Sequence, residues 1–147
     1  MSDEISFRVA EEKDKPFLLK LRIETMNSHI LNAGLSPNDD NHIERINYRF
    51  DCARIVMSNG EEIGLLKVVK EGSPWDLVQI QLISSKQGQG IGSKIILEVL
   101  NQAFKNNAGV KLSVFKENPA KKLYAELGFK TYLETETTYE MQANIHA

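Results

Sequence analysis

The feature that most limits what this 147-residue chain can fold into is a glycine-rich segment, Gln87-Gly88-Gln89-Gly90-Ile91-Gly92. Before it, Val78, Ile80 and Leu82 alternate with polar residues, which predicts a strand over Leu77–Ile83. After it, apolar residues recur at helical spacing: Ile91, Ile95, Ile96, Val99, Leu100, Ala103 and Phe104. Three glycines in five positions allow a sharp turn and a close approach of the backbone to a ligand.

Such a turn places free N–H groups at the start of a helix, where they and the helix dipole form an anion site suited to a pyrophosphate. A plain connecting turn is the other interpretation, and the segment alone does not decide between them. It is not a P-loop, because Ser93 rather than Lys follows Gly92. A Rossmann fingerprint would need Gly in place of Ser93 and belongs to a first strand–helix unit, whereas about four strand-like segments precede this loop.

Alternation, helical periodicity and turn residues predict the elements before this loop. The Asn59-Gly60 dipeptide favours a tight hairpin turn. The expected order is a strand with Ile5, Phe7 and Val9 on one face (Ile5–Ala10), a helix with a stripe of Leu19, Ile23, Met26 and Ile30 (Lys15–Ile30), a loop (Asn32–Asn41), a short helix (Asn41–Tyr48) and two strands (Cys52–Ser58 and Glu62–Lys70).

The last part of the chain is expected to form a strand, a helix and two further strands. Asn118 is suited to cap the helix, with Pro119 in its first turn and Gly128 as its terminator. The strands are Val110–Phe115, Phe129–Glu134 and Thr138–Ala143, and the buried face of the helix is Ala120, Leu123, Tyr124 and Leu127. Together these patterns predict one domain over residues 1–147 with an α/β fold, in which a mixed sheet carries helices on both faces.

Composition narrows the class of function. The hydrophobic share of 41% supports a core, and the net charge of −2 argues against a nucleic-acid partner. No apolar run approaches a membrane span, and the acidic start Met1-Ser2-Asp3-Glu4 does not resemble a signal peptide. A lone cysteine, Cys52, suits a reducing compartment, so we expect a cytoplasmic protein. Three scattered histidines and one cysteine show no metal-ligand spacing, so no metal is expected.

Two motifs give the chain a resemblance to the GCN5-related N-acetyltransferase (GNAT) superfamily. Gln87, Gly90 and Gly92 match its motif A, Gln/Arg-x-x-Gly-x-Gly/Ala. One helix and one strand later, a second set resembles its motif B: Asn118, Ala120, Leu123-Tyr124 and Leu127-Gly128-Phe129. The resemblance implies a mostly antiparallel sheet of about seven strands and transfer of an acetyl group from acetyl-CoA to a primary amine by direct attack. A non-catalytic sensor of CoA or acetyl-CoA, or an interaction module on the same fold, is the alternative.

The resemblance also assigns the cofactor site. Val110–Phe115 would splay from Leu77–Ile83 and open a slot. The strand before the loop would bulge and offer backbone groups to the pantetheine arm, and the loop would bind the pyrophosphate. The residues so implied are Leu82, Ile83 and Ser84 for the arm, Gln87, Gly88, Gln89, Gly90, Ile91 and Gly92 with Ser93 for the pyrophosphate, and Asn118 and Tyr124 beside the arm and the sulfur. Lys86 and Lys121 are candidates for the 3′-phosphate, or ordinary solvated charges.

Acetyl transfer needs an unprotonated amine, and an alkylamine with a pKa near 10.4 is mostly charged at neutral pH. Some members of the superfamily place a glutamate on the strand before motif A, but this chain has Gln79 and Gln81 there. Glu24 and His29 are the other candidates for a base, against a solvated helix face and a helix-end histidine. Tyr124 is the candidate acid for the leaving thiolate, against a purely structural core aromatic.

The resemblance assigns the acceptor amine, on a small molecule or a peptide, to the region Glu24–Asn47 and the last hairpin. Charges of both signs lie in and just after that region, so they do not identify the acceptor: Glu24, Asp39, Asp40, Glu44, Arg45 and Arg49. Cys52 is interpreted as a buried small hydrophobe, Trp75 as a loop or core residue, and His42 and His146 as loop and tail residues. A homodimer is left open.

Overall fold

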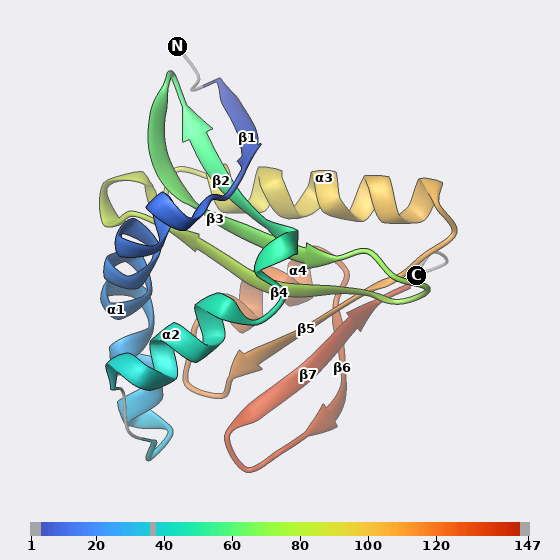
Figure 1. Cartoon of the computed structure of the whole chain (residues 1–147). Coiled ribbons are helices and arrows are strands. Elements are labelled where there is room, and N and C mark those ends of the chain that lie inside the picture. Colours follow the sequence, from blue (N-terminus) through green and yellow to red (C-terminus); the bar gives the residue numbers. More distant parts are fainter. Residues whose placement is uncertain (1–3, 36–37, 145–147) are drawn as a thin grey trace.

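The structure is a computed structural model that describes residues 4–35 and 38–144, so His146 and part of the predicted Asn32–Asn41 loop lie outside it. Figure 1 shows its elements in chain order. They are β1 (Ile5–Val9), α1 (Lys15–Asn32), α2 (Asp39–Asn47), β2 (Ala53–Ser58), β3 (Glu61–Val69), β4 (Trp75–Leu82), α3 (Ile91–Lys105), β5 (Val110–Phe115), α4 (Ala120–Glu126), β6 (Lys130–Glu134) and β7 (Thr138–Ala143), with short 3-10 turns at Glu12–Asp14, Phe50–Cys52 and Ser84–Lys86.

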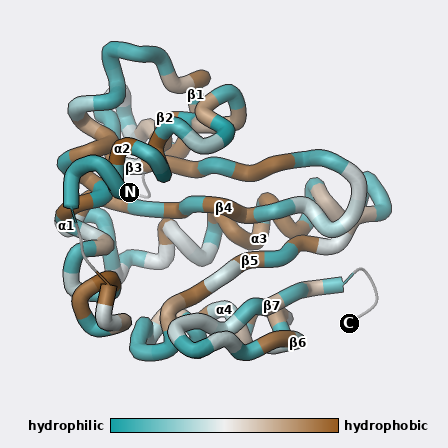
Figure 2. The backbone as a smooth tube through the Cα atoms, turned by 60° about the horizontal axis from the view of Figure 1, so that its bottom comes forward, coloured by the Kyte–Doolittle hydropathy of each residue, from teal (hydrophilic) through white to brown (hydrophobic). Residues whose placement is uncertain are grey.

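The strands form one mixed sheet of seven in the order β1-β2-β3-β4-β5-β7-β6. Only β4 and β5 pair in parallel, and their register holds for two residue pairs, Trp75 with Val110 and Asp76 with Lys111. Beyond these pairs the two strands diverge, as Figure 2 shows on the side nearer α1. The predicted mixed sheet and the predicted splay of the two strands are therefore both present.

Helices cover both faces of the sheet, as predicted. On one face, α1 and α2 enclose a small core around Leu18, Leu21 and Leu65. On the other, α3 packs against a larger core that includes Leu66, Val99 and Phe129. Figure 1 shows α1 and α2 side by side and α3 running apart from them.

Three local signals in the sequence produce the turns they predict. Asn59 and Gly60 both have positive φ, 51° and 83°, as the tight turn between β2 and β3 requires. The Asn118 side chain accepts a hydrogen bond of 2.9 Å from the backbone N–H of Ala120 and so caps α4. After α4, Gly128 has φ 105°, and the backbone N–H of Phe129 donates to the carbonyl of Tyr124 at 3.0 Å.

The largest departure from the predicted pattern lies in β4. The register between β3 and β4 shifts between Lys67 and Val68, which pair with Gln79 and Leu77 and leave Val78 as an extra residue. Such a bulge moves the residues that follow it to the opposite face. Gln79 and Gln81 are consequently buried, 5% and 7% exposed, on the face with α1 and α2. The bulge at Val78 therefore lies before Leu82–Ser84, where the family resemblance implied that the strand would bulge.

Phe7 and Val9 lie on one face of β1, as predicted, and both are exposed there. Two other predicted placements are wrong. The buried residues of α1 are Leu18, Leu21, Arg22 and Ile30, so only Ile30 of the predicted stripe is buried. His42 is a fully buried residue of α2 rather than a loop residue.

The structure also shows the positions of Cys52, Trp75 and the predicted buried face of α4. Cys52 is only partly buried, in the turn before β2, where its thiol lies 3.5 Å from the side chains of Arg49 and Asp51. Trp75 begins β4 and packs in the larger core, which agrees with the core interpretation. The predicted buried face of α4 is half-buried, because Ala120, Leu123 and Tyr124 line a cavity.

Candidate acyl-CoA and acceptor site

The glycine-rich segment forms a tight turn at the start of α3. Gly88 and Gly90 have φ of 74° and 82°, which side chains other than that of glycine rarely adopt. The first helical hydrogen bond of α3 runs from the N–H of Lys94 to the carbonyl of Gly90 at 3.1 Å. The preceding N–H groups, those of Ile91, Gly92 and Ser93, therefore have no partner within the helix. This is the arrangement that binds a phosphate at a helix N-terminus.

A cavity of about 560 Å³, which we call the glycine-turn cavity, opens over this turn, between α1, β4, α3 and α4. Its lining includes eight of the residues predicted to bind the cofactor: Leu82, Gln87, Gly88, Gly90, Gly92, Ser93, Asn118 and Tyr124. Gly92 faces open space, since a Cβ there would meet only Leu82 Cδ1 within 4 Å, at 4.0 Å. The side chain of Gln87 donates to the carbonyl of Leu82 at 2.9 Å and ties the turn to the end of β4.

The other four predicted cofactor residues do not line this cavity. Ile91 is a core residue, and Gln89 donates to the carbonyl of Ser85 at 2.7 Å. Ser84 begins a 3-10 turn, and the backbone N–H of Ile83 is bound to the carbonyl of Ile63 at 2.9 Å. Within the described residues, backbone groups on the β5-facing edge of β4 beyond Asp76 have no strand partner, so they are available to an extended ligand.

Tyr124 projects from α4 into the splay between β4 and β5. Its ring packs edge-on against Phe129, with ring centroids 6.1 Å apart. Within the described residues its hydroxyl makes no hydrogen bond. Burial raises the pKa of the phenol above its ordinary value of 10.0, so Tyr124 stays protonated at neutral pH.

A second cavity, of about 610 Å³, lies on the other side of Tyr124, and we call it the acceptor cavity. It extends between β4 and β5 toward α2. The residues that line both cavities are Met26, Ile80, Gln81, Asn118 and Tyr124. We call the place where these residues separate the two cavities the junction. A ligand bound over the glycine-rich turn and one in the acceptor cavity would thus meet at Tyr124.

Two amides in the wall of the acceptor cavity carry acceptor atoms without a partner. Oε1 of Gln79 and Oε1 of Gln81 are buried and make no hydrogen bond within the described residues. Gln81 is held close to β3, since any Cβ on Gly64 would meet the Gln81 carbonyl oxygen. A buried acceptor atom without a partner costs free energy, which a bound N–H donor would recover.

An arginine and a histidine behind the acceptor cavity form a connected network. Nε of Arg22 donates to Nδ1 of His42 at 3.0 Å, so the neutral histidine carries its hydrogen on Nε2 and donates it to Oδ1 of Asn27 at 2.7 Å. Burial, and then the nearby Arg22 cation, lower the pKa of His42 below its ordinary value of 6.5. His42 is therefore neutral, and it holds the side chain of Arg22 in place rather than acting as a base.

Lys67 of β3 is a fully buried residue that fixes the end of α2. Its Nζ donates to the carbonyls of Arg45, Ile46 and Tyr48 at 3.0, 3.1 and 2.6 Å. Burial, and then the Arg45 and Arg22 cations, lower the pKa of Lys67 to about 8, so the ammonium is still largely protonated at pH 7. Lys67 thereby sets where Arg45 stands at the rim of the acceptor cavity.

The two base candidates from α1 lie at the mouth of the glycine-turn cavity. Glu24 is exposed, lines the cavity and makes no ion pair within the described residues. His29 also lines it, with Nδ1 3.1 Å from a carboxylate oxygen of Glu117. The structure places Glu24 near the glycine turn and not in the acceptor cavity, since Glu24 lines only the first of these two cavities.

Arg22 and Lys67 are buried cations that the sequence analysis did not single out. Arg22 lies four positions after Leu18 and one after Leu21, and a cation on the buried face of a helix needs a partner. Lys67 interrupts the otherwise apolar run from Ile63 to Val69, which is a signal for a buried charge. Both signals were present, but which face is buried was wrongly predicted for α1.

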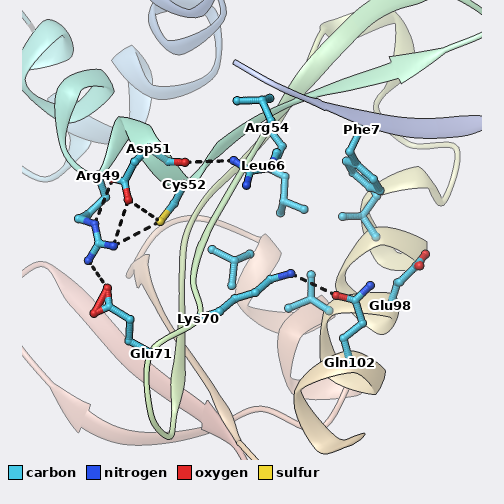
Figure 3. Close-up of a pocket in the computed structure, with 14 residues that line it drawn as sticks. Phe7, Arg49, Asp51, Cys52, Arg54, Leu66, Lys70, Glu71, Glu98 and Gln102 are labelled. Atoms are coloured by element: carbon cyan, nitrogen blue, oxygen red, sulfur yellow. Dashed lines mark hydrogen bonds and ion pairs between the residues drawn. The ribbon is translucent and has the colours of Figure 1, made fainter. Parts of the chain in front are cut away.

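A third cavity lies at the opposite face, between the β1–β3 end of the sheet and α3, and holds about 520 Å³. None of the predicted site residues lines it. Figure 3 shows that its cations are occupied: Arg49 pairs with Asp51 at 3.2 Å and Glu71 at 2.6 Å, and Lys70 donates to Gln102 at 3.3 Å.

Within residues 4–35 and 38–144, no cluster of three or more His, Cys, Asp or Glu side chains is arranged to hold a metal ion. Over the same ranges, no helix has the length and apolar character needed to cross a membrane.

The helix N-terminus at the glycine-rich turn and the splay between β4 and β5 are suited to an extended phosphorylated ligand. Comparison with known proteins agrees. A family model described as "Acetyltransferase (GNAT) domain" matches residues 38–141. The chain belongs to this family, as its two motifs indicated.

Solved structures show the same fold. The PaiA N-acetyltransferase from Thermoplasma acidophilum, in complex with coenzyme A, is 16% identical with a TM-score of 0.73, covering 96% of this chain and 99% of that one. An acetyltransferase from Thermus thermophilus is 18% identical with a TM-score of 0.71, covering 94% and 95%. Arabidopsis thaliana Naa50, with the bisubstrate analogue CoA-Ac-MVNAL, is 18% identical with a TM-score of 0.66, covering 95% and 98%. Among curated proteins, no significant match is found.

Proposed function

We propose that residues 1–147 form a single acetyltransferase domain of the cytoplasm, which moves an acetyl group from acetyl-CoA to a primary amine of a small-molecule or peptide acceptor. One observation carries the proposal: Tyr124 lies where the glycine-turn cavity meets the acceptor cavity. Its hydroxyl makes no hydrogen bond within the described residues. Family membership supports the proposal, and so do structural neighbours described with coenzyme A or a CoA bisubstrate analogue.

The start of α3 and the open edge of β4 fit two parts of acetyl-CoA, its pyrophosphate and its pantetheine arm. The N–H groups before the first hydrogen bond of α3 suit a pyrophosphate, since they donate without a side chain in the way. The unpaired edge of β4 beyond Asp76 suits the amides of an extended arm. Acetyl-CoA supplies a thioester, whose carbonyl carbon accepts the amine and whose sulfur leaves.

In the proposed reaction the amine nitrogen forms a bond to the carbonyl carbon and the carbon–sulfur bond breaks. The phenol of Tyr124 donates its proton to the departing thiolate, which leaves as the CoA thiol. The attacking nitrogen loses one proton, which passes through water and Glu24 to solvent, and solvent returns one proton to the Tyr124 phenolate. The orphan Oε1 of Gln81, at the junction, accepts a hydrogen bond from the incoming N–H and orients it. Gln81 cannot remove a proton, so we assign that role to Glu24 acting through water from the cofactor side.

The test is release of free CoA thiol from acetyl-CoA in the presence of a panel of amines, with each product identified by mass. We expect thiol release that depends on the amine and an N-acetylated product. Stabilisation by CoA without thiol release from any amine would instead identify a CoA-binding module without catalysis. No stabilisation at all would reject both assignments.

A further inference from the structure

The acceptor cavity has an unusual charge for a chain with a net charge of −2. Among the described residues that line it, two are arginines, Arg22 and Arg45, and none is an aspartate or glutamate. Neither arginine forms an ion pair within the described part of the chain. The third cavity shows the contrast, because its Arg49 is paired with two carboxylates (Figure 3).

Arg22 gives the stronger evidence for an anion site, because this arginine is only 8% exposed and still lacks a carboxylate partner within the described residues. Only its Nε is engaged, by His42, so the two terminal NH₂ groups have no acceptor within the described residues. Burial, and then the cation of Arg45, lower the pKa of Arg22 to about 10. Two arginines that face one cavity and repel each other, one of them buried, form a site for an anion.

Acidic residues near this site form no ion pair with Arg22 or Arg45 within the described residues, and the acid on α2 that acts on His42, Asp39, does not line the cavity. Glu140 of β7 accepts hydrogen bonds from Ser113 and Thr138, at 2.6 and 2.8 Å, and does not itself line the cavity. Asp76 is influenced by Arg45 but forms no ion pair with it, and burial raises its pKa. Arg45 lies over the ring of Tyr48, 5.4 Å from its centroid, and its carbonyl is bound by Lys67.

We propose that the acceptor amine belongs to a molecule that also carries an anionic group, a carboxylate or a phosphate, which Arg22 and Arg45 bind while Gln81 receives the amine. The inference rests on the proposed function in taking this cavity as the acceptor side. A bare ammonium ion would be repelled by the two arginines, whereas an anionic group binds them and delivers its amine to the junction. The same cations disfavour the charged form of the amine and so promote its attack.

The experiment measures equilibrium binding without catalysis, on protein saturated with CoA. The ligands are matched pairs of N-acetylated products: N-acetyl-β-alanine and its amide test the carboxylate, and N-acetyl-O-phosphoethanolamine and N-acetylethanolamine test the phosphate. A short N-acetylated peptide with Asp or Asn at its second position tests an acidic peptide. The variants are Arg45→Gln and Arg45→Glu, with Arg54→Gln as control, because Arg54 binds backbone carbonyls beside the third cavity.

We expect the anionic member of at least one pair to bind at least tenfold more tightly than its neutral partner. Arg45→Gln should weaken that binding at least tenfold, Arg45→Glu should remove it, and Arg54→Gln should leave it unchanged. Anionic members that bind no better than neutral ones, or a preference that survives in Arg45→Gln, would overturn the inference. Carboxylate or phosphate binding without thiol release would keep the anion site and reject acetyl transfer, so the two failures are distinguishable.

Discussion

Replacing Tyr124 by phenylalanine separates a catalytic phenol from a core aromatic. The ring remains and keeps its edge-on contact with Phe129. The lost hydroxyl makes no hydrogen bond within the described residues, so the folded state loses no partner. We therefore expect the melting temperature and the affinity for CoA to stay nearly unchanged.

The expected loss is in the rate. General-acid assistance is worth about a hundredfold or more, and a hundredfold corresponds to about 2.7 kcal/mol of activation free energy. Because burial raises the pKa of Tyr124 above 10.0, its contribution should persist across the neutral range and should end only as pH rises through that higher pKa. The steady-state rate of thiol release, with an amine for which chemistry limits turnover, measures kcat directly.

The matched control is Tyr139→Phe, because Tyr139 is a half-buried tyrosine of β7 that lines neither the glycine-turn cavity nor the acceptor cavity. Its kcat should equal that of the unmodified protein. Full activity in Tyr124→Phe, under conditions where chemistry is rate-limiting, would show that Tyr124 is a packing residue and not the acid. An equal loss in both variants would point to packing as well.

Three further predictions follow from the buried polar groups. Gln81→Glu introduces a carboxylate at the junction of the cavities, so the pH–rate profile of kcat/KM should extend to lower pH; a profile that matches the unmodified protein would mean that the side chain does not face the amine. Lys67→Met leaves the last carbonyls of α2 without their donor and should lower the free energy of unfolding by about 2–4 kcal/mol in denaturant titrations; an unchanged midpoint would contradict this. The pKa of His42 is lower in the folded than in the unfolded chain, so stability should fall as pH drops below about 6.5 toward the folded value; the same pH dependence in His42→Gln would assign it to another group.

Local signals were enough to predict most of the fold. The stripe of α3 and the turn residues Asn59-Gly60 and Gly128 each act over a few neighbours in sequence, and the structure follows them. The alternation in β4 predicted the strand itself but not which of its side chains are buried. The glycine-rich turn belongs to the same category, because positive φ at Gly88 and Gly90 is a property of those residues themselves. The predicted mixed sheet agrees with the structure, because a strand parallel to β4 needs a crossover connection, and α3 provides it.

Contacts between residues far apart in the sequence determine the features that the sequence did not predict. The bulge at Val78 exists only in the pairing of β4 with β3, and it moves Gln79 and Gln81 to the buried face. Arg22 is buried because His42, twenty positions away, supplies an acceptor. The charge of the acceptor cavity follows from these contacts, so the mixed charges between Glu24 and Asn47 in the sequence gave no indication of it.

Thermal unfolding with and without CoA shows whether the turn from Gln87 to Gly92 binds CoA, as we propose. At a CoA concentration 100 times its Kd, binding stabilises the folded state by about 2.7 kcal/mol, which for a chain of this size raises Tm by roughly 6–10 °C. Gly92→Ala should keep a folded protein, because a Cβ there meets only Leu82 Cδ1 at 4.0 Å. Gly92→Asp should also fold but should lose the shift, since its carboxylate repels the pyrophosphate. The account predicts a CoA-dependent rise in Tm for the unmodified protein and none for Gly92→Asp; no rise in the unmodified protein, or an equal rise in Gly92→Asp, would contradict it.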